Sequence, residues 1–542
     1  MRSLKIIFSI LLISGLSVGC VQFGKVVGKF LTSSTSDLNE SSTQIRYVRN
    51  TYNPEVKTTE VSYFKDWNAG RNMVGLNSFK REGAGMLKID GTVKSNGNEI
   101  PYIANGAYAE FVDDLSPQTI DIETVSGQQI SFTVSPIEEV KIKSVNGGSG
   151  EIDLSKDLVL EFNEPAQSEN PNMRAMLLMD FMGTRSFADI ANFKAADKVV
   201  IPAEAFKHLP GLNPITGDSY LMIERYKVTP HTSGGIGAAQ ILSLSWDTVP
   251  VKVSNNVKQI NGLPVKNTIE DENGTFTYNA SKPNAFLGKP FSKGKKFALT
   301  SLTVRATKLQ QSRSESSSST AYYSSYSVKT TTTTTETRAF PKLPEVFWDN
   351  LLNSMYTDVT ATLQNNFDIE FIPVEEVLKA PSYAKLKPIE DGITQVEVSK
   401  SYKGTKPLLP TTFSAIMGSI STTFASDRID ARLLNELGVD GLIAITIDLE
   451  MPWEEFSLSP RMSFRITGAP NGYLYGPTVF AEGVIHGNGI ELDEVNQEEV
   501  NIELLNQIVR KDALISAFDD ALRALKAEES KHGYEQIWAL QD

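Results

Sequence analysis

Cysteine is nearly absent, because the 542-residue sequence contains one, Cys20. A lone cysteine excludes an intrachain disulfide, so stability must come from buried apolar surface or from a metal. Histidine is also scarce, and the four are His208, His231, His486 and His532. They lack the i, i+4 spacing of a helical zinc pair, so we expect isolated surface or turn histidines and no metal site.

Basic residues are too few to outnumber acidic ones: Lys and Arg total 52, Asp and Glu total 65, and the net charge is −13. Such a chain repels phosphate backbones at long range, which argues against nucleic acid as a partner. Long apolar runs are missing after residue 20, so no ordinary transmembrane helix is expected there. At roughly 150 residues per domain, the length suggests three or four domains.

The first 19 residues have the pattern of a secretory signal peptide. Arg2 and Lys5 precede an apolar run from Ile6 to Ile13, and the small residues Ser17 and Gly19 follow. The apolar run is about half the roughly 20 residues that span a bilayer. We therefore expect this segment to be removed.

Gly15 to Cys20 resembles the lipobox of bacterial lipoproteins, in which a small residue precedes a cysteine that is acylated. The resemblance implies lipidation at Cys20 and anchoring to a membrane, with Val21 favouring the outer membrane. One position departs from the pattern, because Ser17 stands where Leu is usual. An ordinary signal-peptidase site is the alternative, and it would release a soluble protein with Cys20 as a free terminal thiol.

The body after the signal divides by its patterns. Residues 20–59 are polar and rich in Ser and Thr, as in a flexible tether. From about residue 60 to residue 255, period-two alternation between Gly and Asn turns predicts antiparallel strands. Ile120 and Ile122, for example, alternate with acidic residues. Two Ig-like β-sandwich domains that meet near Gly147 explain this best.

The remaining sequence predicts a single-sheet α/β sandwich. Residues 297–304 and 442–447 read as strands, and residues 344–363 and 427–437 read as helices with one apolar stripe. The complete division is a signal peptide (1–19), a lipid-anchored tether (20–59), two β-sandwich domains (60–146 and 147–255), a linker (256–290), an α/β domain (291–500) with a disordered Ser/Thr-rich insert (312–337), and a C-terminal helix (501–542).

Two stretches carry a family resemblance: the strand-to-helix step Ile369–Val377, and the helix-to-strand step Leu433–Ile443. With the preceding strand and helix, they resemble the α/β domain shared by the curli-secretion lipoproteins and the amino-terminal domain of the Tol-system translocation protein. The resemblance covers roughly residues 291–500. It implies a location at the outer membrane and binding to other envelope proteins.

Curli-secretion proteins also form a pore from amphipathic hairpins, and such strands need about 9 to 11 residues with one apolar face. The insert at residues 312–337 is mostly Ser and Thr and has no continuous apolar face. We therefore expect a binding or assembly role without such a channel.

Catalytic and cofactor motifs are incomplete. Gly288 to Lys295 has the wrong spacing for a phosphate loop, and Ser233 to Gly237 follows no clear strand. Glu454 and Glu455 are neighbours on one extended segment, so their side chains point to opposite faces. We expect no catalytic residue and no cofactor.

The sequence therefore predicts a non-catalytic, membrane-anchored envelope lipoprotein that binds envelope proteins or polymers. The alternative is a carbohydrate- or peptide-active hydrolase that uses the β-sandwich modules as accessories.

Overall fold

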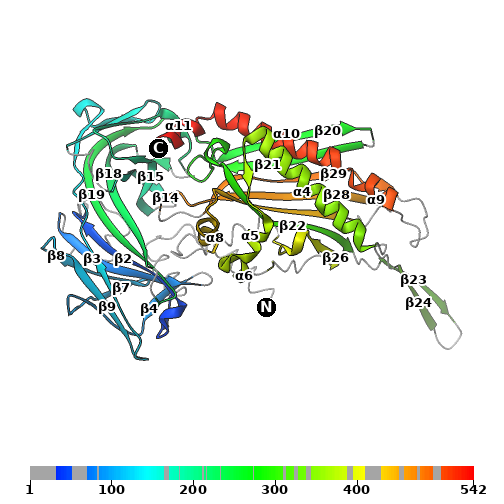
Figure 1. Ribbon diagram of the computed structural model, residues 1–542, viewed down its shortest axis with the longest axis horizontal. Helices are drawn as coiled ribbons and strands as arrows, with labels where there is room; N and C mark the ends of the chain where they lie inside the picture. The colour runs from blue at the N-terminus through cyan, green and yellow to red at the C-terminus, as the bar shows by residue number, and fades with distance from the viewer. Residues whose placement is uncertain are drawn as a thin grey trace.

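The computed structural model (Figure 1) describes residues 32–51, 70–81, 85–163, 170–181, 184–209, 213–214, 216–231, 234–272, 274–308, 313–322, 327–336, 344–386, 388, 395–408, 429–450, 457–472, 477–491 and 502–542. Cys20 and Glu454–Glu455 lie outside the described residues. Strands predominate, and the long helices belong to the C-terminal half. In this described part, no helix has both the length and the apolar character needed to cross a membrane.

The N-terminal half is built around a twelve-stranded sheet. Its main path runs in the order β1-β4-β3-β2-β19-β18-β14-β15. The bounds of these strands are β1 (Thr32–Thr35), β2 (Ser41–Arg49), β3 (Asn72–Lys80), β4 (Met86–Ile89), β14 (Asn172–Phe181), β15 (Thr184–Lys194), β18 (Gly217–His231) and β19 (Ala238–Ser254). Off this path lie β7 (Tyr102–Ala104), β8 (Ala107–Val112), β12 (Glu151–Asp153) and β17 (Asn213–Pro214).

Two smaller sheets pack against this large sheet. One contains β5 (Gly91–Ser95), β6 (Asn98–Glu99), β9 (Gln118–Thr124) and β10 (Gln129–Val134), and the other contains β11 (Ile142–Val145), β13 (Leu158–Phe162) and β16 (Lys198–Ile201). Ile120 and Ile122 of β9 are buried in one core with Ile45 and Tyr47 of β2. The predicted alternation thus places apolar residues between sheets, as in a β-sandwich.

The predicted tether at residues 20–59 is wrong where the structure describes it. Strand β2 pairs with β3 on one side and with β19 on the other. Its polar side chains are satisfied inside the sheet, since the Ser41 hydroxyl donates to the Leu38 carbonyl at 2.8 Å. Serine and threonine can therefore occupy a central strand because their hydroxyl groups form local hydrogen bonds.

The predicted separation into two sandwiches near Gly147 also needs correction. β2 lies before Gly147 and β19 lies after it, yet they pair in parallel from Ser42–Ala238 to Arg49–Ser245. One continuous sheet therefore crosses the expected boundary.

Residues 256–290, expected to be a linker, contain a long hairpin. β20 (Gly262–Asp271) pairs with β21 (Gly274–Pro283) along its whole length. Phe276 and Tyr278 are buried in the core. The prediction failed because the strands alternate weakly and depend on helix α10 (Lys511–Lys531) for their apolar contact.

This hairpin opens a nine-stranded sheet whose main path is β20-β21-β29-β28-β27-β22-β25. The further strands are β22 (Lys296–Lys308), β25 (Glu370–Phe371), β26 (Gln395–Ser401), β27 (Gly441–Glu450), β28 (Ser457–Gly468), β29 (Thr478–Gly487) and β30 (Ile490–Glu491). β26 joins through β22 and β30 through β28. The strands predicted at residues 297–304 and 442–447 correspond to β22 and β27.

Helices cover this sheet (Figure 1). They are α4 (Glu345–Phe367), α5 (Val374–Lys379), α6 (Pro381–Lys385), α8 (Ile429–Leu437), α9 (Ile502–Val509), α10 (Lys511–Lys531) and α11 (Tyr534–Ala539). The apolar stripe predicted for residues 344–363 is buried in the core, where α4 contacts β22 and α10. Leu433 and Leu434 of α8 pack on Ala298 and Leu442, which belong to the opposite face of the same sheet.

The insert at residues 312–337, predicted to be disordered, contains two paired strands. β23 (Arg313–Tyr322) and β24 (Ser327–Glu336) form an antiparallel hairpin that extends from the body (Figure 1). Backbone pairing needs no apolar core, and threonine favours extended backbone. The low-complexity composition therefore did not exclude a hairpin.

The predicted C-terminal helix at residues 501–542 is divided into α9, α10 and α11. Arg510, with φ of 42°, separates α9 from α10, and Gly533, with φ of 70°, precedes α11. Trp538 of α11 donates through Nε1 to the carbonyl of Ala285 at 2.8 Å. The backbone N–H of Lys194 in β15 donates to the Leu540 carbonyl at 3.1 Å. The C-terminus thus fastens the large sheet of the N-terminal half to the segment before β22.

Candidate functional site

Three of the four histidines lie at two separate places in the fold. His208 is fully buried, its Nε2 lies 2.8 Å from the His532 carbonyl, and its Nδ1 accepts from the Ala285 N–H. Burial lowers the pKa of His208 to about 4. His486 lies on strand β29, and burial and the nearby charge of Arg461 lower its pKa. In the described part of the chain, no three His, Cys, Asp or Glu side chains are grouped to hold a metal ion.

The two incomplete glycine-rich motifs lie between strands, one between β21 and β22 and the other between β18 and β19. Gly288 lies in the segment before β22, and its carbonyl accepts from the Trp538 Nε1 at 3.1 Å. Gly234 to Gly237 form a bend before β19. Neither segment lies at the start of a helix, as a phosphate-binding or dinucleotide-binding loop requires.

A buried charge cluster lies within the twelve-stranded sheet. Arg174 Nε lies 2.7 Å from Glu224 Oε1, and Arg174 also faces Asp189 at 3.5 Å. Trp246 Nε1 donates to the second oxygen of Glu224 at 2.5 Å. Burial raises the pKa of Asp189 to about 6, although the positive charge of Arg174 opposes this effect.

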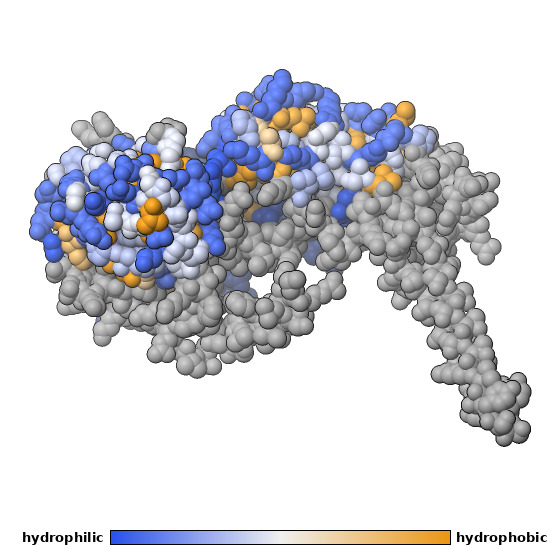
Figure 2. Space-filling view, turned by 90° about the horizontal axis from the view of Figure 1, so that it is seen from below, coloured by the Kyte–Doolittle hydropathy of each residue, from blue (hydrophilic) through white to orange (hydrophobic). Residues whose placement is uncertain are grey.

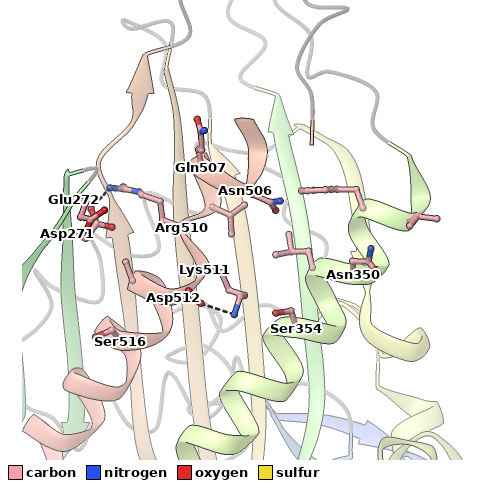
Figure 3. Close-up of a pocket in the computed structure, with 15 residues that line it drawn as sticks. Asp271, Glu272, Asn350, Ser354, Asn506, Gln507, Arg510, Lys511, Asp512 and Ser516 are labelled. Carbon is pink, nitrogen blue, oxygen red and sulfur yellow. Dashed lines mark hydrogen bonds and ion pairs between the residues drawn. The ribbon is translucent and has the colours of Figure 1, made fainter. Parts of the chain in front are cut away.

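The main candidate site is a groove of about 930 Å³ in the C-terminal half (Figure 3). It lies between the first turns of α4 and the junction of α9 with α10, and the tip of the β20–β21 hairpin closes one end. Such a volume is at the upper end of ordinary ligand pockets, which span about 300–1,000 Å³.

The floor of the groove is apolar and its rim is polar. Phe347, Leu351 and Val509 are buried beneath it. The rim carries the amides of Asn350, Asn506 and Gln507 and the hydroxyls of Ser354 and Ser516. In Figure 3 Asn506 and Lys511 face the helix that carries Asn350 and Ser354.

Arg510 holds the wall of the groove together. Its guanidinium lies 3.3 Å from Asp271 Oδ1, donates to the Asn488 carbonyl at 2.9 Å, and lies 4.4 Å from the centre of the Phe276 ring. The residue has left-handed backbone geometry, which turns the chain between α9 and α10. Arg510 is therefore a structural cation joined to β20.

Lys511 fastens the two helices that flank the groove. Its ammonium group forms ion pairs with Asp358 of α4 and with Asp512 beside it, the latter at 2.9 Å. Burial lowers the pKa of Lys511, but the bonds and charges of the two carboxylates outweigh it and leave the pKa above its ordinary value. This cation is also already engaged within the protein.

One large apolar side chain is exposed in the groove. Four large ones are exposed among the described residues, namely Leu115, Val125, Val200 and Val346. Val346, 65% exposed, lines the groove. Seen from below, the described surface is mostly hydrophilic, with small separate hydrophobic areas (Figure 2).

Sequence reasoning did not find this groove. Its residues come from three segments, at 271–272, 346–354 and 506–516, and none carries a recognisable motif. The sequence pattern did indicate one part of the groove, the helix at residues 344–363, which carries Val346.

Comparisons with known proteins give no family. No family model matches the chain, and no curated protein matches it. Among solved structures, the FN1–FN3 domains of chicken CNTN1 match with 8% identity and a TM-score of 0.12, over 78% of this chain and 94% of that one. A likeness this slight carries no argument about function.

Proposed function

We propose that this chain is a lipoprotein of the bacterial envelope, anchored to the outer membrane through Cys20, which binds an envelope protein or polymer without catalysing a reaction. The signal-peptide pattern and the position of the single cysteine support the anchor. The groove between α4 and α10 supports the binding role.

The observation that carries the binding role is the exposed Val346 above a buried apolar floor. An apolar pocket with a few polar groups around it is the usual form of a binding site. Arg510 and Lys511, the two cations of the groove, are both engaged in ion pairs that stabilise the walls. The groove is thus equipped to hold a ligand, and its two cations already stabilise its walls.

The proposed domain organisation is a β-sandwich half, in which two small sheets pack on one large continuous sheet, followed by an α/β unit. The core around Ile120 supports the sandwich half, whereas the core that contains Leu160 continues into the C-terminal half through Phe297 and Leu522. The parallel pairing of β22 with β27, with α8 directly before β27, supports the α/β unit. This order also supports the resemblance to the curli-secretion and Tol-system domains, which implies docking to other envelope components.

Photo-crosslinking in intact cells tests this function. A photoreactive residue in place of Val346 should yield an adduct in the membrane fraction. The same residue in place of Val125, which is 71% exposed in the turn between β9 and β10, should not yield it. The Cys20→Ser variant should lose the adduct together with membrane association.

Equal adducts from the two valine positions would contradict a role for the groove. Turnover of a bound polymer that stops after a single carboxylate substitution would instead favour the hydrolase.

A further inference from the structure

The solvent-facing charge at the groove is negative. Asp512 has a side chain that is 95% exposed, and Glu272 is exposed at the hairpin tip. Glu272 forms no ion pair within the described part of the chain. Arg510 has a side chain only 3% exposed and lies against Asp271. Lys511, 28% exposed, pairs with both Asp358 and Asp512. The four carboxylates around the groove, those of Asp271, Glu272, Asp358 and Asp512, therefore outnumber its two cations and leave an excess of negative charge.

Apolar side chains line the same groove. Val346 is exposed on α4, and Phe347 and Leu351 form the floor next to it. The opposite wall adds Val509 and Ala513. A ligand that gains from both features needs positive charge beside apolar side chains.

Exposed amides complete the chemistry of the rim. Asn350 lies on α4, and Asn506 and Gln507 lie on α9 (Figure 3). An amide group both donates and accepts hydrogen bonds, so it can pair with the N–H and C=O groups of a peptide backbone. A lipid chain would leave these amides without partners at a cost in free energy.

We propose that the groove binds a short cationic, apolar peptide segment of a partner protein. Its lysine or arginine side chains approach Glu272 and Asp512, and its apolar side chains cover Val346 and the floor. This inference rests on the proposed binding function and names its ligand class.

The test uses the full mature lipoprotein in detergent micelles and two fluorescent peptides of equal length. One alternates leucine with lysine, and the other alternates leucine with glutamate. Fluorescence anisotropy should show binding of the lysine peptide, weakened by salt, and much weaker binding of the glutamate peptide.

Charge reversal at the mouth separates this site from general attraction to an acidic protein. The double substitution Glu272→Lys and Asp512→Lys should raise the Kd of the lysine peptide about tenfold, because two attractions become repulsions. Glu99→Lys with Glu123→Lys makes the same change in charge at exposed positions on β6 and β9, and should leave the Kd nearly unchanged.

Filling the groove tests the apolar part of the inference. Ser354→Trp should weaken binding of the lysine peptide, and an unchanged melting temperature would show that the fold persists. Equal binding of both peptides, or the same loss from the control pair, would overturn the ligand class. If the photoreactive residue in place of Val346 still crosslinks to a partner while the lysine peptide fails to bind, the proposed ligand class is wrong and the proposed binding function stands.

Discussion

Lys282 of β21 and Glu529 of α10 form an ion pair in which neither side chain reaches solvent. Lys282 also donates to the Lys289 carbonyl at 2.6 Å, and Glu529 accepts from the Phe291 N–H at 3.2 Å. The pair joins the hairpin of residues 262–283 to the last long helix. It shows that this hairpin is an integral part of the C-terminal half.

Removing one partner of this pair should destabilise the protein strongly. Lys282→Met leaves Glu529 as a buried charge without its cation, at a cost of about 3–5 kcal/mol in the free energy of unfolding. Adding Glu529→Leu should restore part of the loss, because no buried charge then remains. Chemical denaturation of the single and double variants measures both effects.

Lys511→Met provides the matched control, since Lys511 is partly exposed and should cost about 1 kcal/mol or less. A Lys282→Met variant as stable as the parent would show that the pair contributes nothing.

Acid should weaken the contact at His208. Its folded-state pKa of about 4 lies below the ordinary value of 6.5, so the unfolded chain binds the proton first. The contribution of neutral His208 is complete above about pH 6.5, falls as the pH drops toward 4, and amounts to about 3 kcal/mol at most.

Urea denaturation at several pH values measures this slope. His208→Gln, which cannot titrate, should flatten it between about pH 6.5 and pH 4. An identical slope in the two proteins would assign the pH dependence to other groups.

Asp189 should act in the opposite direction. Burial raises its pKa to about 6 from 3.8, so ionisation disfavours the folded state as the pH rises through this window. Asp189→Asn should therefore be more stable than the parent at about pH 7, by about 3 kcal/mol at most, and the difference should vanish below about pH 4. Thermal melting at the two pH values measures the difference.

Glu224→Gln is the informative comparison, because Glu224 holds Arg174 at 2.7 Å and its loss should destabilise the protein. An Asp189→Asn variant that is less stable than the parent at about pH 7 would mean that the attraction of Arg174 outweighs the cost of burial.

Elements that bury a regular apolar pattern were visible in the sequence. The helix at 344–363 is an example, since Trp348, Leu352 and Met355 recur on one side and are all buried. Strand β9 is another, because Ile120 and Ile122 alternate with polar residues. In both cases the local sequence pattern indicates which face of the element is buried.

Elements whose place depends on distant partners were not visible. Strand β2 begins with four polar residues and is central only because β3 and β19 pair with it. The break at Arg510 follows from contacts with Asp271 and Asn488, which lie far away in the sequence. The groove needed this break and the hairpin tip together, so no single segment predicted it.

The parallel pairing of β2 with β19 also sets an order for folding. During synthesis from the N-terminus, β2 emerges well before Ala238, which begins its partner strand. Until then β2 has one edge without its final neighbour, and open strand edges are where chains aggregate. The core around Ile120 includes Ala239 of β19, so it cannot be completed before β19 is made. The N-terminal half is therefore expected to fold late and to be prone to aggregation until then.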